Sequence, residues 1–289
     1  MRSPAAGSHG AGNPPEVFRE SASMLVRIPE PYDFELSTER LRAFGSDLAN
    51  TFHEGALYRV IAGREVRVAP APGGVEVEPC DPQIRALVEK LLGLEFDLAS
   101  FADWAAGEPV LAAIVARLRG LRPPLLPDPF ESLVTSITAQ QVSLRSALVM
   151  RNRLTARFGE RGVRAYSFPQ RAALAVAEEH ELVSLGFSRR KAEYVIGLAR
   201  AELDLGALAS ASDEEVRAAL TAVRGLGPWS AEWFLARHLA RPRAWPVGDL
   251  VLRKAAHLFY GSEVHELGRR LDPFQNLSAH YLLSAFRIP

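Results

Sequence analysis

An isolated carboxylate that follows a glycine-lined turn is the feature of this sequence most suited to chemistry. Asp249 stands in the segment WPVGDL at residues 245–250 and follows Gly227 by 22 residues. Gly225 and Gly227 leave the backbone bare just before Pro228, a residue that suits the first turn of a helix. N–H groups at such a helix start attract an anion, and a phosphate is the obvious anion of an extended partner. The same glycines also suit a plain helix end.

Trp229 and Trp233 are four residues apart, so a helix presents both indoles on one face. They either pack in the core or line a pocket, where a flat cation would gain roughly 0.5–2 kcal/mol from each indole. Asp249 also has two roles open to it. It is a favourable N-cap for a helix that starts at Leu250, and a carboxylate at a cleft stabilises positive charge that develops in a reaction. The two roles are compatible, because a capping aspartate can still present an oxygen to the cleft.

Two helices must hold this turn. Ser212 and Glu215 form a capping box at the start of the first helix. The apolar stripe of that helix consists of Val216, Leu220 and Val223. The second helix starts at Pro228 and continues with the apolar residues Ala231, Phe234 and Leu235. The pattern therefore predicts a hairpin of two helices with the glycines at its tip.

A further helix is predicted upstream, with Asp128 as its cap and Glu131 completing a capping box. It ends at the polar segment TAQQVS, residues 138–143, whose final serine suits the cap of the next helix. Gln140 and Gln141 in this segment form either a solvated turn or a polar tip. Such a tip would enter a DNA groove and fill the gap left by a displaced base.

A basic cluster marks another helix start. Ser188 is a suitable cap, and the first turn that follows it contains Arg189, Arg190 and Lys191. Positive charge is unfavourable at a helix N-terminus because it opposes the helix dipole. A phosphate partner would neutralise this positive charge, although a solvated basic patch by itself lowers stability only slightly.

The first third of the chain has a different pattern, typical of strands. Alternating apolar residues occur at Tyr58, Val60, Val66 and Val68. Residues 75–78 (VEVE) predict another strand after a turn at 70–74, and a helical stripe follows at 84–91. These elements predict a small antiparallel sheet backed by helices, which we interpret as a scaffold.

From residue 128 the chain is predicted to be helical. Two of its last helices are expected at 251–260 and, after a cap at Asp272, up to residue 286. The predicted fold class is therefore α+β, with a small antiparallel-sheet domain followed by a mainly helical region.

Composition limits the function further. The 289 residues carry no formal net charge, so any DNA-binding face must be local. The single cysteine, Cys80, excludes an intramolecular disulfide and any all-cysteine zinc or iron–sulfur site. No apolar run approaches the roughly 20 residues of a membrane span. Residues 1–24 are predicted to form a disordered tail without a secretion signal, and we expect a cytoplasmic protein that works at the nucleoid.

The hairpin, the spacing and Asp249 together resemble the helix-hairpin-helix (HhH-GPD) DNA glycosylase superfamily. Residues 31–34 (PYDF), 138–143 and 185–192 are similar to segments of its AlkA-type DNA-3-methyladenine glycosylase II members. The resemblance extends from residue 29 to the C-terminus.

This resemblance implies an α/β N-terminal domain at 25–104 and a helical glycosylase region at 105–289. Within that region, residues 128–240 would form the hairpin-bearing domain. Residues 105–127 and 241–289 would together form a second helical domain, with the active-site cleft between the two.

Position by position, the resemblance implies Asp249 as the catalytic carboxylate. The implied base pocket consists of Trp229, Trp233, Phe274 and Arg40. The residues implied in DNA binding are Gln140, Gln141, Gly225, Gly227, Ser230, Arg190 and Lys191, with Gln141 as the wedge. The implied ligands of a Na⁺ or K⁺ ion are the backbone carbonyls of Thr221, Val223 and Leu226. No cofactor is implied for catalysis.

The sequence departs from the family pattern at several of these positions. Gln141 is polar where the best-known member has an apolar wedge. Arg40 stands where an aromatic residue is expected, and Phe274 stands where tryptophan is frequent. Trp229 occupies the position of the lysine nucleophile of strand-cleaving relatives, which predicts that this chain forms no Schiff base.

The resemblance implies a monofunctional, monomeric DNA glycosylase that excises bases of the 3-methyladenine and 7-methylguanine type from double-stranded DNA in base-excision repair. A base alkylated on a ring nitrogen is cationic and leaves readily. The enzyme must therefore extrude it, stack it and place a carboxylate beside the electron-poor sugar. Two alternatives are a non-catalytic module that uses the hairpin only to grip DNA, and a glycosylase for oxidised or deaminated bases.

Overall fold

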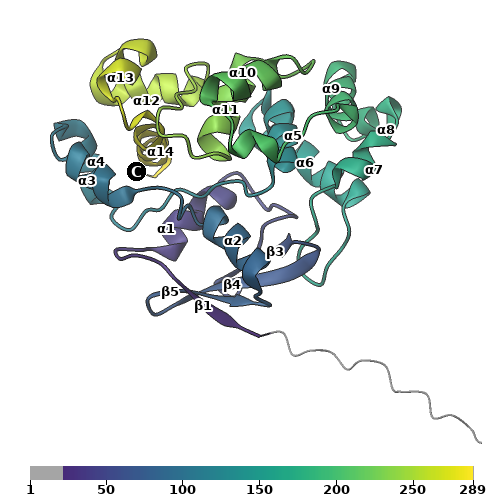
Figure 1. Ribbon diagram of the computed structural model, residues 1–289, viewed down its shortest axis with the longest axis horizontal. Coiled ribbons are helices and arrows are strands. Elements are labelled where there is room, and N and C mark those ends of the chain that lie inside the picture. Colours follow the sequence, from purple (N-terminus) through teal and green to yellow (C-terminus); the bar gives the residue numbers. More distant parts are fainter. Residues whose placement is uncertain (1–21, 289) are drawn as a thin grey trace, which may run out of the picture.

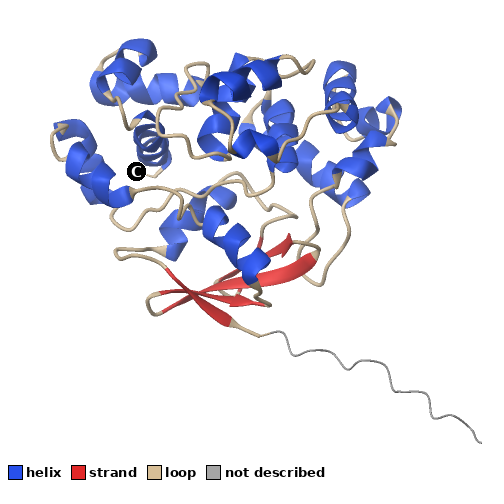
Figure 2. Ribbon diagram, in the orientation of Figure 1, coloured by secondary structure: helices blue, strands red, loops and turns tan. Residues whose placement is uncertain are grey.

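The computed structural model describes residues 22–288 and contains one antiparallel sheet and a larger helical part (Figure 1, Figure 2). The α+β class is confirmed. The predicted tail at 1–24 lies outside the described residues except for its last three, and strand β1 (Met24–Arg27) already begins within it. No helix between residues 22 and 288 is long and apolar enough to cross a membrane.

The sheet has five antiparallel strands in the order β1-β5-β4-β3-β2. The predicted strands correspond to β3 (Ala56–Ile61), β4 (Arg64–Ala71) and β5 (Gly74–Glu78). The inward valines of β4 and β5 have no exposed surface. The sequence does not predict β1 or β2 (Thr51–His53), because each is too short to show a clear alternation.

The turn between β4 and β5 is shorter than the predicted 70–74. Pro70 and Ala71 belong to β4 and pair with Val75 and Gly74 of β5. A proline is tolerated there because β3 pairs with β4 only as far as Val68. Pro70 therefore lies beyond the β3 pairing, where β4 needs no donor on that side.

Three short elements connect the sheet to the helical part. α2 (Pro82–Leu91) follows β5 as predicted and contributes its apolar stripe to the core of the sheet. α1 (Phe34–Thr38) and the 3-10 helix η1 (Glu39–Leu41) follow β1. In Figure 1, α1 and α2 lie between the sheet below and the helical part above.

The helical part consists of two groups. The first contains α5 (Pro129–Ala139), α6 (Leu144–Phe158), α7 (Arg171–Ala175), α8 (Glu179–Ser184), α9 (Arg189–Arg200), η2 (Ala207–Ala209), α10 (Asp213–Thr221) and α11 (Pro228–Arg237). The second contains α3 (Leu98–Ala105), α4 (Pro109–Arg117), α12 (Leu250–Tyr260), α13 (Val264–Arg270) and α14 (Gln275–Arg287). Figure 1 shows the two groups beside each other on the same side of the sheet.

Each of the three parts has its own hydrophobic core. One core belongs to the sheet and α2, one to the first helical group, and one to the second. The last core joins two distant segments of the chain. Phe101 and Ala105 of α3 belong to it, whereas the predicted N-terminal domain extends to residue 104. The chain therefore enters the second helical group before the predicted boundary. The exact domain boundaries remain a prediction.

A buried ion cluster connects the sheet with the first helical group. Asp128 caps α5 as predicted, but Glu131 does not complete a capping box. Its carboxylate instead accepts hydrogen bonds from Arg59 of β3 and Arg151 of α6, and all three side chains are buried. Two guanidinium groups outcompete one backbone N–H because charge-assisted hydrogen bonds are stronger. The sequence could not predict these partners, which lie far from Glu131 along the chain.

Candidate active site

The predicted hairpin joins α10 to α11. The expected capping box starts α10, and Pro228 occupies the first turn of α11. Gly225 has a φ of +96°, and a Cβ there would lie 2.2 Å from the ring of Tyr194 in α9, so both backbone and packing require glycine. A Cβ on Gly227 would meet nothing within 4 Å. The N-terminus of α11 is therefore open at Gly227.

The two glutamines of the α5–α6 junction have different surroundings. Gln140 Nε2 donates to the Gly225 carbonyl at 2.9 Å and lies 3.4 Å from the Ser230 hydroxyl, which is buried. Gln140 and Ser230 thus attach the junction to the hairpin, and the half-buried Gln140 also lines the surface recess beside it. Their predicted contact with DNA stays a prediction. Gln141 is exposed and has a φ of 56°, so it alone forms the tip.

A surface recess beside the hairpin brings several predicted DNA contacts together. Its lining includes Gln141, Arg190, Lys191, Gly225 and Gly227. Arg190 is exposed. Lys191 is buried, its Nζ donates to the Thr138 carbonyl at 2.9 Å, and burial lowers its pKa. The recess therefore presents an exposed guanidinium and an anchored amine next to the open glycine.

Asp249 caps α12 and directly follows a glycine that packs on Trp229. Its Oδ1 accepts from two backbone N–H groups in the first turn of α12, at 2.8 and 3.1 Å. Its Oδ2 has no hydrogen-bond partner among residues 22–288. The preceding Gly248 packs on Trp229, since a Cβ there would lie 3.0 Å from Trp229 Cδ1. The ring centroids of Trp229 and Trp233 are 6.3 Å apart. The backbone just before Asp249 thus lies against the Trp229 indole, and the shared site of carboxylate and indoles stays a prediction.

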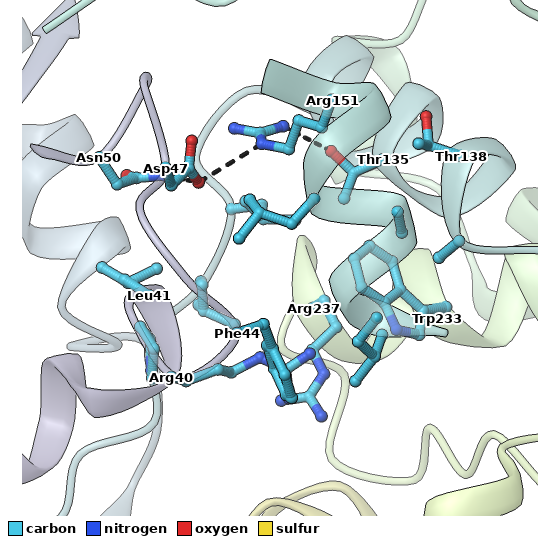
Figure 3. A pocket seen from close by; sticks show the side chains of 17 residues that line it. Arg40, Leu41, Phe44, Asp47, Asn50, Thr135, Thr138, Arg151, Trp233 and Arg237 are labelled. Atoms are coloured by element: carbon cyan, nitrogen blue, oxygen red, sulfur yellow. Dashed lines mark hydrogen bonds and ion pairs between the residues drawn. The ribbon is translucent and has the colours of Figure 1, made fainter. Parts of the chain in front are cut away.

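A cavity of about 140 Å³ lies between the N-terminal domain and the hairpin-bearing helices. Arg40, Phe44, Trp233 and Arg237 line one end of it. Figure 3 shows Arg40 and Arg237 extending toward each other beside Phe44. Among the predicted pocket residues, Trp233 and Arg40 line this cavity, whereas Trp229 is not part of its lining.

Phe274 does not line this cavity, and its predicted place in the base pocket stays a prediction. It is the N-cap of α14, and its ring centroid lies 5.8 Å from Phe101 and 5.3 Å from Trp104. Phe274 is half-buried and packs with these α3 aromatics against the core of the second helical group. Asp272 does not cap α14 either, because its carboxylate pairs with Arg243 at 2.8 Å.

At this end of the cavity, the sequence interpretation missed two residues, Phe44 and Arg237. Arg237 follows Trp233 by four residues, so the helical spacing that pairs the two indoles could have identified it. Phe44 lies in irregular backbone after η1, where no periodicity marks a buried face.

The charges at this end of the cavity influence one another. Burial lowers the pKa of Arg40 to about 10, with a further contribution from Arg287, while Asp249 opposes the change. Burial also lowers the pKa of Arg237 well below its ordinary value; Arg40 adds to this effect and Asp249 opposes it. Arg237 Nη1 contacts the ring of His280, whose pKa is lowered first by burial and then by Arg237. The charge of Asp249 therefore raises the pKa of both arginines, although Asp249 does not itself line the cavity.

The hairpin carbonyls implied for a monovalent cation are partly engaged. The Val223 carbonyl accepts the Leu226 N–H at 3.0 Å. Within residues 22–288, no backbone hydrogen bond reaches the carbonyls of Thr221 or Leu226. Two of the three oxygens are thus available to a cation. No group of three histidine, cysteine or carboxylate side chains in the same part of the chain could hold a metal ion.

The chain is similar to proteins of base excision repair. The HhH-GPD superfamily base excision DNA repair proteins match residues 134–269, a span that contains the hairpin and Asp249. DNA-3-methyladenine glycosylase 2 of Escherichia coli (strain K12) is 32% identical over 206 residues, which cover 69% of this chain and 71% of that protein. A DNA-3-methyladenine glycosylase of Bacillus subtilis (strain 168) is 29% identical over 215 residues, with the same shares covered.

The similarity extends to the whole described fold. The solved 3-methyladenine DNA-glycosylase from Archaeoglobus fulgidus superimposes with a TM-score of 0.83 at 25% identity, covering 92% of this chain and 99% of that chain. Such coverage includes the sheet and both helical groups. With this fold, the glycine hairpin and the capping aspartate in the expected order, the chain belongs to the HhH-GPD superfamily of base excision DNA repair proteins.

Proposed function

We propose that this protein is a monofunctional DNA glycosylase that removes alkylated bases, of the 3-methyladenine and 7-methylguanine type, from double-stranded DNA in base-excision repair. Its family and the activities named for its relatives support this. The observation that carries the proposal is Asp249, a helix-capping carboxylate with one oxygen unengaged, which directly follows a glycine packed on Trp229. The reaction is hydrolysis of an N-glycosidic bond and requires no cofactor.

The hairpin and its neighbours hold the damaged strand. The open N-terminus of α11 at Gly227 and the exposed Arg190 contact phosphates, because backbone N–H groups and guanidinium both favour anions. Gln141 enters the base stack where the damaged base has left. Extrusion costs a few kcal/mol and costs least for a damaged or badly paired base, which supplies part of the selectivity.

The extruded base enters the cavity and stacks on Trp233. A base alkylated on a ring nitrogen carries positive charge, so its bond to the sugar is already weak. Asp249 Oδ2 faces the sugar, stabilises its oxocarbenium-like transition state and orients the attacking water. Trp229 stands in place of an amine nucleophile, so no Schiff base forms and the strand is not cut.

Several finer features belong to the same proposal. The carbonyls of Thr221, Val223 and Leu226 hold a Na⁺ or K⁺ ion that supports the hairpin at the phosphate. The protein acts as a monomer on nucleoid DNA in the cytoplasm. The N-terminal domain at 25–104 supports the two helical domains, with α3 packed in the second of them.

The substitution Asp249→Asn tests the role of the carboxylate without removing the helix cap, because asparagine caps a helix as well as aspartate. On methylated duplex DNA, the unaltered protein should release free 3-methyladenine and 7-methylguanine. Asp249→Asn should release them about 10²–10³-fold more slowly, with unchanged thermal unfolding. The matched control is Asp97→Asn, which neutralises another capping aspartate, at α3, and should not change the rate.

The possible outcomes separate function from mechanism. If the unaltered protein releases no base but binds DNA in a salt-sensitive manner, the chain is a non-catalytic module. If Asp249→Asn keeps full activity, the protein is still a glycosylase, but the proposed catalytic role of Asp249 is wrong. Release of oxidised or deaminated bases without methylated ones would assign the other glycosylase class.

A further inference from the structure

The helix α12, which starts directly after Asp249, has one buried face and one exposed face. Its buried face belongs to the core of the second helical group and consists of Leu252, Ala255 and Ala256. Its exposed face has positive and polar residues in the middle and a leucine at each end: Leu250, Arg253, Lys254, His257 and Leu258. The two leucines are 68% and 64% exposed. Nothing between residues 22 and 288 therefore covers this face.

The positive charges of the exposed face have no anion to neutralise them. No ion pair within 4 Å joins Arg253 or Lys254 to a carboxylate in the described part of the chain, and α12 contains no acidic residue. The neighbouring helix α13 differs, because its Arg270 pairs with Glu108 at 2.8 Å. The whole chain has no formal net charge, so this basic face is a local feature. It is available to an anion from another molecule.

The position of this face relates it to the proposed site of reaction. The Arg253 N–H donates to the Asp249 carbonyl at 3.0 Å, so Arg253 lies one helical turn beyond Asp249. His257 lies one turn further, which extends the face to about 12 Å from Asp249. This length is comparable with the axial rise of about three nucleotides in one DNA strand. Side chains on a helix lean toward its N-terminus, so Arg253 and Lys254 lean toward the Asp249 end.

The face lies away from the phosphate-binding recess that we propose at the hairpin. That recess is lined by Arg190 of α9 and by Gly227. Figure 1 shows α12 on one side of α11, and α6 and α9 on the other side. A strand whose sugar lies at Asp249 can therefore meet the recess on one side of the lesion and α12 on the other. Guanidinium and ammonium groups both bind phosphate oxygens, and such contacts position a protein on DNA.

We propose that the exposed face of α12 is a second DNA-backbone contact, which binds phosphates of the damaged strand on the side of the lesion away from the hairpin recess. Arg253 and Lys254 bind the phosphates nearer the lesion, and His257 donates a ring N–H to the next one. Contacts on both sides of the lesion fix the path of the strand and turn its sugar toward Asp249. This inference rests on the proposed glycosylase function and adds the part of the strand held beyond Asp249.

The test measures binding to a duplex with one tetrahydrofuran abasic nucleotide at several salt concentrations. The double variant Arg253→Gln/Lys254→Gln should bind about three- to thirtyfold more weakly, the loss of two exposed charge pairs. The slope of log affinity against log salt should decrease in magnitude by about two, because two phosphate contacts are lost. The matched control, Arg27→Gln/Arg119→Gln, removes two exposed charges from β1 and from the turn after α4. It should leave the slope unchanged.

Uncharged methylphosphonate linkages locate the contact on the DNA. Each linkage replaces one phosphate of the damaged strand, on one side of the lesion or the other. On the α12 side, it should weaken binding by the unaltered protein and have much less effect on the double variant, which has already lost that contact. On the hairpin side, it should weaken binding by both proteins equally.

Two results would overturn the inference: an unchanged salt slope in the double variant, or equal methylphosphonate losses in both proteins on both sides of the lesion. If the double variant does not fold, Lys254→Gln alone decides, because the inference requires its slope to decrease by about one. The glycosylase function is tested separately, by release of 3-methyladenine from methylated duplex DNA. Absence of release by the unaltered protein would overturn that function, and the salt slope would still decide whether α12 contacts DNA.

Discussion

Adjacent residues of the same type have different surroundings at the α5–α6 junction, because the backbone turns between them. Gln140 is bound to the hairpin through its amide, whereas Gln141 is exposed with a left-handed φ of 56°. A non-glycine residue in that conformation loses about 1–3 kcal/mol unless its surroundings impose it. Backbone strain at an exposed tip is consistent with a residue that is placed for contact with a ligand.

Alanine substitutions should separate the two glutamines. Gln140→Ala removes the hydrogen bond to the Gly225 carbonyl and should lower the free energy of unfolding by about 1 kcal/mol. Gln141→Ala should change that free energy by less than about 0.5 kcal/mol, as an exposed substitution does. It should, however, reduce the fraction of extruded base in the DNA complex. Urea unfolding measures the first effect and 2-aminopurine fluorescence beside the lesion the second. Normal extrusion by Gln141→Ala would contradict its role as wedge.

The hairpin, at the scale of one element, uses its two glycines for different physical reasons. Gly225 packs directly against the Tyr194 ring in a left-handed conformation, so a side chain there has neither space nor an allowed φ. Gly227 has an ordinary φ of −110° and open space where a Cβ would stand. The first glycine builds the turn, and the second leaves the helix N-terminus accessible.

This difference predicts that alanine affects stability at Gly225 and DNA binding at Gly227. Gly225→Ala should lower the free energy of unfolding by about 1–3 kcal/mol, because the methyl group meets Tyr194 and the backbone is strained. Gly227→Ala should leave unfolding nearly unchanged and weaken DNA binding, because its methyl group would occupy the position that we propose for a phosphate. Thermal unfolding and titration of a labelled duplex at fixed salt measure the two effects. Unchanged DNA affinity in Gly227→Ala would remove the hairpin from the binding surface.

At the scale of the whole molecule, the sheet and the hairpin-bearing helices meet around the cavity and are joined by the buried cluster of Arg59, Glu131 and Arg151. Burial raises the pKa of Glu131, but the charges of Arg59 and Arg151 outweigh it and hold that pKa below its ordinary value of 4.5. A buried carboxylate between two guanidinium groups thus sets the position of the N-terminal domain, and with it the position of Arg40.

Loss of this carboxylate should destabilise the protein strongly. Glu131→Gln leaves the buried Arg59 without its anion and Arg151 with Asp47 alone, and should lower the free energy of unfolding by about 3–5 kcal/mol at neutral pH. The control is Glu76→Gln, which removes the carboxylate of a partly exposed pair with Arg67 and should cost less than about 1 kcal/mol. Urea unfolding at pH 7 measures both. Similar losses in the two variants would show that the cluster does not hold the domains together.

The same cluster predicts a pH dependence. Because the pKa of Glu131 is lowered on folding, its contribution to stability is present above about pH 4.5 and is lost as the pH falls through the lower, folded-state pKa. Stability of the unaltered protein should therefore fall more steeply below pH 4.5 than stability of Glu131→Gln. Parallel pH profiles of urea unfolding for the two proteins would contradict this assignment.

The sequence by itself determined the features that depend on neighbours a few residues away. The Ser212–Glu215 capping box, Pro228 in the first turn of α11, and Asp249 as the cap of α12 each require only a short segment to fold. The alternating strands and the α+β class follow from the same local patterns. For this reason the order of hairpin and aspartate, and the family they indicate, could be recognised before any coordinates.

Only the tertiary structure decided which distant groups meet. Glu131 does not form its predicted capping box because its carboxylate binds two arginines from other elements. Phe274 packs against the aromatic residues of α3. Arg40 and Arg237 come from different domains, so no local pattern relates them. Their meeting beside Trp233 depends on how the domains pack, because electrostatic and packing contacts act through space and not along the chain.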